Sequence, residues 1–181
     1  GRLTLNPIVH VDPIGTIAIP VINMVTGIPF LFGWAKPVPI NPSRFRKYRP
    51  GLFWVAVAGP GSNVLMAFLS AFFLCAFVKW APDTFSLYRP IAMMAMVGVQ
   101  INFVLALFNL FPLPPLDGGR ILESFLSYNG TQMLRQVERY SFFILIALLW
   151  SGAFSVIERP VNYLTHIAMG VAQGAFGVSL F

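Results

Sequence analysis

Charged residues are scarce in this chain of 181 residues. They make up 10% of it, against about a quarter in a typical soluble domain, while 57% of the residues are hydrophobic and the mean hydropathy is +0.75. This balance excludes an ordinary soluble domain and predicts an integral membrane protein of about one domain. Cysteine is scarce too. The single one, Cys75, excludes an internal disulfide and is expected to be a small buried hydrophobe within an apolar run.

Acidic residues are absent from the most basic segment, residues 35–50, which holds five Lys and Arg residues between apolar runs. Cations in this position are typical of a cytoplasmic loop. Phosphate or nucleic-acid binding is the alternative, but the loop bias suffices to explain the net charge of +6, so no nucleic-acid partner is expected. Two crossings after this loop return the chain to the same side, where Arg120, Arg135 and Arg139 follow. Residues 35–50 and Asp117 are therefore expected on the cytoplasmic side of the cell membrane.

The apolar runs predict an all-α polytopic membrane protein in which residues 1–181 form one membrane-embedded domain. About 20 apolar residues cross the hydrocarbon core of a bilayer. Runs of about this length or longer predict transmembrane helices at 52–80, 91–112 and 141–157. A last apolar helix is expected at 161–181, either as a further span or at the membrane surface.

The N-terminal segments have a different pattern. Residues 1–20 alternate apolar and polar side chains and contain Pro7 and Pro13, which predicts a membrane-associated β segment. Residues 17–34 are apolar but interrupted by prolines and glycines, which predicts a re-entrant or broken segment.

A carboxylate stands directly after an apolar run that is broken by prolines. Three prolines lie within residues 112–115, and Asp117 follows with two glycines behind it. An acid beside a membrane segment is costly, which makes Asp117 a candidate functional residue. A plain turn at the membrane surface is the alternative. Asn102 and Asn109, two helical turns apart, would continue a polar face toward Asp117.

A second motif, Ala58-Gly-Pro-Gly-Ser-Asn63, lies within the first long apolar run. Its small residues allow close helix approach in lipid. Asn63 either bonds to another helix or lines a site.

Histidine is nearly absent. A catalytic zinc site takes three protein ligands, for example two histidines and a carboxylate. The chain has two histidines, His10 and His166, and neither belongs to an H-E-x-x-H helix. His10 is expected in a loop or at the surface, and His166 on a helix face or at the membrane interface. A zinc site made by both with Asp117 is the less favoured alternative.

Three ordered motifs resemble the site-2 protease family of intramembrane zinc metalloproteases. Residues 109–120 resemble its second zinc motif, residues 1–13 its membrane-associated β segment, and residues 58–63 the small-residue motif of its second core helix. The resemblance implies a zinc metalloprotease core that cleaves transmembrane segments of membrane-protein substrates within the lipid bilayer. It implies that Asp117 is the third zinc ligand, that Asn109 positions the substrate or the developing oxyanion, and that Asn63 is a site-lining or helix-packing residue.

The sequence departs from that family in one respect. The family's H-E-x-x-H helix, which supplies two histidine ligands and the glutamate base, would precede the β segment, and this chain begins at that segment. We therefore expect that the helix is absent from the chain shown, that the remaining zinc ligands lie outside it, and that the chain by itself is inactive. The alternatives are a catalytically inactive homologue or scaffold that binds transmembrane helices, and a transporter. The transporter is disfavoured because the proline-Asp-Gly-Gly pattern has no second copy.

Overall fold

The computed structural model describes residues 8, 11–26, 45–82, 84, 86–152 and 155–179, and every regular element in these ranges is a helix. The chain divides into two compact units, Gly1–Phe45 and Arg46–Phe181, and each is described here by itself. The expectation that residues 1–181 form one membrane-embedded domain stays a prediction.

In the first unit, a π-helix Pro13–Ala18 leads into α1, Ile19–Thr26. Asp12 starts this helical stretch, because its Oδ1 accepts hydrogen bonds from Ile14 N at 3.0 Å and Gly15 N at 2.9 Å. Proline at the first helical position adds to this cap, since its fixed φ suits a helix start and its missing N–H has no helical partner there.

The predicted β segment is therefore wrong over residues 13–20, which are helical. Its positions 1–7 and 9–10 lie outside the described residues. The predicted re-entrant segment 17–34 is helical as far as Thr26, and residues 27–34 lie outside the described part of the chain.

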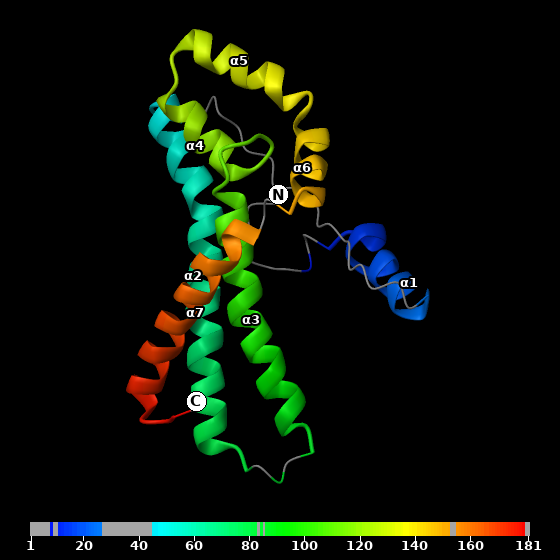
Figure 1. Ribbon diagram of the computed structural model, residues 1–181, viewed down its shortest axis with the longest axis vertical. Coiled ribbons are helices and arrows are strands. Elements are labelled where there is room, and N and C mark those ends of the chain that lie inside the picture. Colours follow the sequence, from blue (N-terminus) through cyan, green and yellow to red (C-terminus); the bar gives the residue numbers. More distant parts are fainter. Residues whose placement is uncertain are drawn as a thin grey trace. The chain divides into compact units, whose positions relative to one another are not determined.

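The second unit is built on two long helices, α2, Tyr48–Trp80, and α3, Tyr88–Asn109 (Figure 1). Both are long and apolar enough to cross a bilayer. The predicted span 52–80 lies within α2, which begins one turn earlier. The predicted span 91–112 overlaps α3, but the helix ends at Asn109, because the prolines at 112–115 cannot continue it.

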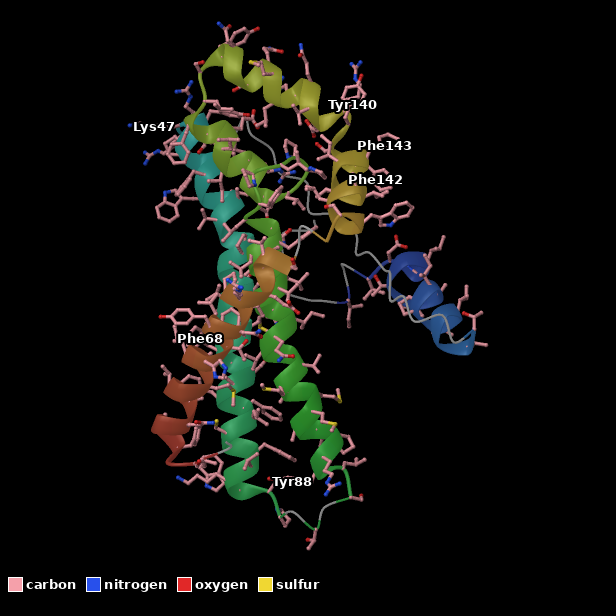
Figure 2. All side chains as sticks on the ribbon, viewed as in Figure 1. Lys47, Phe68, Tyr88, Tyr140, Phe142 and Phe143 are labelled. Atoms are coloured by element: carbon pink, nitrogen blue, oxygen red, sulfur yellow. The ribbon has the colours of Figure 1, made fainter. Side chains whose placement is uncertain are left out.

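The two long helices are antiparallel. The ring centroids of Phe77 and Tyr88 lie 5.2 Å apart near the connecting loop, and those of Phe68 and Phe103 lie 6.1 Å apart further along. Lys47 and Tyr88 mark the N-terminal ends of α2 and α3. They lie at opposite ends of the helix pair, with Phe68 between them (Figure 2). The start of α2 and the end of α3 therefore lie at the same end of the unit.

A third helix, α7, Ser155–Phe176, packs against both (Figure 1). The core that the three helices share consists largely of small side chains with no exposed surface: Ala67, Ala71, Cys75, Ala168 and Ala172. Small residues let helix backbones approach closely, which matters in lipid because apolar side chains gain nothing by leaving one hydrocarbon for another. The predicted burial of Cys75 is confirmed.

Three shorter helices complete the unit: α4, Asp117–Phe125, α5, Tyr128–Glu138, and α6, Ser141–Trp150. The prediction of one continuous helix over 141–157 is wrong, because a turn at residues 151–152 follows α6 and Gly152 there has φ +72°. That left-handed conformation favours glycine.

The predicted boundary between the helices at 141–157 and 161–181 is also wrong, since α7 runs through it with Pro160 in its interior. Proline costs the helix one backbone hydrogen bond, and α7 offsets this by burying apolar side chains after it, Val161, Ala168 and Ala172, against α2 and α3.

Candidate functional site at the junction of α2, α3 and α4

A tight reversal of the chain connects α3 to α4 and presents Asp117. Leu113 N donates to Phe111 O at 2.7 Å, and Leu116 N donates to Leu113 O at 3.0 Å. Leu113 is 8% exposed, so the reversal is anchored in protein. These local bonds satisfy backbone groups that the prolines remove from a helix. Asp117 follows at the first position of α4, where the helix dipole favours a negative charge.

The two glycines after Asp117 are required by close backbone contact. A Cβ added to Gly118 would overlap the carbonyl oxygens of Leu110 and Phe111, and one added to Gly119 would lie 2.5 Å from Pro114 N. Real Cβ atoms essentially never come so close to backbone atoms. The two glycines are therefore needed because the first turn of α4 rests on the backbone of its own connecting loop.

Gly118→Ala is accordingly expected to destabilise the protein by about 1–3 kcal/mol, the usual cost of overpacking. The measurement is thermal unfolding of the detergent-solubilised protein. Gly170→Ala on α7 is the matched control, since its Cβ would meet no described atom within 4 Å and helix propensity favours alanine by up to about 1 kcal/mol. Equal unfolding temperatures for Gly118→Ala and the parent protein would contradict the packing described here.

The carboxylate of Asp117 lies against Gly59 of α2. A Cβ at Gly59 would overlap Asp117 Oδ2, so the position admits only glycine in this arrangement. On α2 itself, Ser62 Oγ donates to Gly59 O at 2.7 Å. The small-residue motif at 58–63 and the proline-Asp-Gly-Gly motif therefore meet at one point.

Asp117 is half-buried, and this burial raises the pKa of its carboxyl above the usual range. The nearby Arg120 guanidinium acts in the opposite direction and lowers the pKa. The carboxylate is thus partly desolvated, with a cation one turn along α4.

Asn109 and Asn63, the other predicted site residues, lie near this contact along the helices. Asn109 is the last residue of α3. The antiparallel helices α2 and α3 are in contact at Phe68 and Phe103. Following both helices from this contact, the end of α3 lies level with residues 58–63 of α2. Asn63 lies one turn beyond Gly59 on the same face of α2. Both asparagines are half-buried, and their roles stay predictions.

Asn102, which was expected to extend a polar face toward Asp117, is engaged in its own helix. Its Nδ2 donates to Gly98 O at 2.8 Å. Gly98 in turn faces Ser70 of α2, whose Oγ would lie 3.0 Å from a Cβ at that position. This part of α3 therefore serves helix packing.

The described residues do not make up a whole zinc site. No group of three or more His, Cys, Asp and Glu side chains comes together among them. His166 is exposed on α7, and His10 lies outside the described residues. Asp117, as a partly buried carboxylate in a protein-anchored turn, fits the part of a single metal ligand.

Sequence reasoning missed two features of the site. The first is the role of Gly59 as the surface on which the Asp117 carboxylate rests. The second is the pair of contacts that Glu123 makes with other helices. Glu123 Oε1 lies 3.8 Å from Arg135 Nη2 of α5 and accepts a 3.4 Å hydrogen bond from Tyr48 OH of α2. Helical spacing within one segment could not show either contact, because both join separate helices.

Comparison with known proteins bears on this geometry. Residues 84–152, which include Asn109 and Asp117, match the family described as peptidase family M50. The chain is 40% identical over 162 residues to the Bacillus subtilis protein named "Putative zinc metalloprotease YwhC", covering 89% of this chain and 70% of that protein. It is 28% identical over 155 residues to the Mycolicibacterium smegmatis protein named "Putative zinc metalloprotease Rip2", covering 86% of this chain and 56% of that protein.

A Methanocaldococcus jannaschii protein named "Putative zinc metalloprotease MJ0611" is 33% identical over 72 residues, which are 38% of this chain and 32% of that protein. No solved structure matches the chain. The chain belongs to peptidase family M50, the site-2 protease family. The resemblance stated from its motifs is thereby confirmed.

Proposed function

We propose that this chain forms part of an intramembrane zinc metalloendopeptidase that cleaves transmembrane segments of membrane-protein substrates. Membership of a peptidase family and relatives named as zinc metalloproteases support the reaction class. The two long apolar helices support its location in the bilayer. The single observation that carries the proposal is the half-buried Asp117 carboxylate, presented by a proline-rich turn against Gly59 where α2, α3 and α4 meet.

Asp117 would be one of three protein ligands of a zinc ion, and the other two would lie outside the described residues. Bound zinc supplies Lewis acidity and lowers the pKa of a water ligand, so that a nucleophile is available at neutral pH. The contact with Gly59 and the close packing of Gly118 and Gly119 on the connecting loop would hold the Asp117 carboxylate in one place. A fixed ligand matters because small displacements in a metal site weaken binding.

Asn109 would position the substrate, since its amide can donate to a peptide carbonyl and so favour a developing oxyanion. Asn63 would line the same site from α2. Both would act at the end of the α2–α3 pair that carries Lys47 and Arg49, which the positive-inside rule assigns to the cytoplasmic side. We propose the cell membrane as the location, with residues 35–50 and Asp117 toward the cytoplasm.

Removal of metal from the full-length protein tests this function. Cleavage of a single-span membrane protein by the purified enzyme in detergent is expected to fall to background with a zinc chelator and to return when zinc is added. The reason is that the protein groups alone offer no nucleophile of comparable strength. The measurement is the appearance of the cleaved fragment with time.

Cleavage that persists in the chelator would contradict the zinc mechanism. Retention of zinc with no cleavage of any substrate in a panel of single-span proteins would favour the alternative, an inactive homologue that binds transmembrane helices.

A further inference from the structure

A pocket lined by polar and charged residues lies away from Asp117, where the start of α2 meets α4 and α5. Its volume is about 240 Å³. Arg49 and Arg135 are its two cations, and Tyr48, Tyr128 and Thr131 contribute hydroxyl groups. These are the donors that recognise phosphate oxygens, and guanidinium groups do so with two parallel hydrogen bonds.

The pocket also contains one acid, Glu123, whose charge would oppose an anion. This carboxylate is already engaged with Arg135 at 3.8 Å and with the Tyr48 hydroxyl at 3.4 Å. Its side chain is 19% exposed, whereas that of Arg135 is 61% exposed. Arg135 therefore keeps donors free on its exposed side, and Arg49 adds a second cation, so the lining carries a net positive charge.

An apolar groove of about 360 Å³ adjoins the pocket and shares Arg49 with it. Phe53 lines the groove and meets Phe125 of α4 edge to face, with ring centroids 5.6 Å apart. Trp54 and Phe125 remain 68% and 71% exposed. A cationic, hydroxyl-rich pocket that continues into an aromatic groove matches a ligand with an anionic head and a hydrocarbon chain.

The length of α2 places this site at the bilayer surface. With 22 residues, α3 is about 33 Å long, close to the thickness of the hydrocarbon core. With 33 residues, α2 is about 50 Å long, so its extra turns extend past the end of α3. Because the antiparallel pairing brings the end of α3 level with residues 58–63, the extension consists of Tyr48 and the ten or so residues after it. Tyr48 and Trp54 are also residue types enriched at this level.

We propose that this combined site binds one anionic phospholipid of the surrounding bilayer. The phosphate lies between Arg49 and Arg135, and an acyl chain runs along Phe53, Trp54 and Phe125. A free phosphate ion would use the pocket and leave the groove without a role. The site involves neither Asp117 nor zinc, so the inference stands apart from the proposed peptidase activity.

Native mass spectrometry of the full-length protein, released from detergent with phosphatidylglycerol or phosphatidylcholine, tests this inference. The parent protein is expected to retain one phosphatidylglycerol molecule in preference to phosphatidylcholine. Arg49→Gln with Arg135→Gln is expected to weaken that retention at least about tenfold, since two charge-assisted contacts are lost. The matched control is Arg89→Gln with Arg159→Gln, two exposed cations away from the pocket, which should retain the lipid like the parent.

A second pair of variants tests the groove. Trp54→Ser with Phe125→Ser is expected to lower retention of the lipid, whereas Phe143→Ser, an equally exposed aromatic on α6, is expected to have no effect. Unchanged thermal unfolding shows that each variant is folded.

Equal retention by the parent and the double-arginine variant would overturn the proposal. The proposal would also be overturned if inorganic phosphate at millimolar concentration displaced the lipid and the groove variant retained the lipid like the parent. The site would then recognise phosphate alone.

Discussion

Asp117→Ala in the full-length protein is expected to reduce bound zinc from about one ion per molecule to almost none. A catalytic zinc site has about three protein ligands, and loss of even an outer-shell partner costs about 10–100-fold in metal affinity. Asp117 is proposed as a direct ligand held against Gly59, so its loss should lower metal affinity by more than that. Elemental analysis of the purified protein gives the zinc content directly, and it does not require a known substrate.

Glu123→Ala is the matched control for this prediction. Both acids lie on α4, but Glu123 faces Tyr48 and Arg135 instead of Gly59. Its replacement removes the same charge from the same helix, and zinc content should be unchanged. Equal zinc in the parent protein and in Asp117→Ala would show that Asp117 is not a ligand. Equal loss in both variants would indicate that α4 has been disturbed as a whole.

Gly59→Val is expected to lower zinc affinity by about 10–100-fold, in the range of other changes that displace a metal ligand indirectly. The reason is steric, since a Cβ at Gly59 overlaps Asp117 Oδ2 and the branched side chain adds further atoms there. The carboxylate would have to move, although every ligand would remain in the sequence. Zinc affinity is measured by competition with a chromophoric chelator.

Gly61→Val offers a closely matched control, two residues further along the same helix. A Cβ at Gly61 would have no described atom within 4 Å. Both substitutions change helix propensity in the same way, so a difference between them isolates the contact with Asp117. If Gly61→Val lowered zinc affinity as much as Gly59→Val, the effect would come from α2 as a whole and the positioning role of Gly59 would be rejected.

Local sequence patterns predicted the elements that depend on local properties. The hydropathy of α2 and α3 was sufficient to locate both, because a bilayer-crossing helix must be apolar over about 20 residues whatever packs against it. The prolines before Asp117, and Asp117 itself, indicated the candidate site in the same way, since an acid beside a membrane segment is costly without a function. The ordered motifs around Asn63, Asn109 and Asp117 identified the family.

Some local signals were outweighed by others. The alternating pattern over residues 1–20 favoured a β segment, but the Asp12–Pro13 pair is a helix start, and the cap determines the structure of residues 13–20. The apolar run at 141–157 concealed the turn at residues 151–152. The expected boundary between 141–157 and 161–181 is not present, because α7 continues through Pro160 while its buried residues pack on α2 and α3.

The sequence by itself determined that this is a membrane-type helical chain of peptidase family M50 with a carboxylate after a proline-broken helix. Only the tertiary structure decided what that carboxylate touches. Gly59 and Asp117 meet because α2 and α3 are antiparallel and α4 folds back onto α2, and no periodicity within one helix encodes such a contact. The same folding brings Arg49 and Arg135 to one pocket. Contacts between separate helices depend on packing, and packing is a property of the assembled chain.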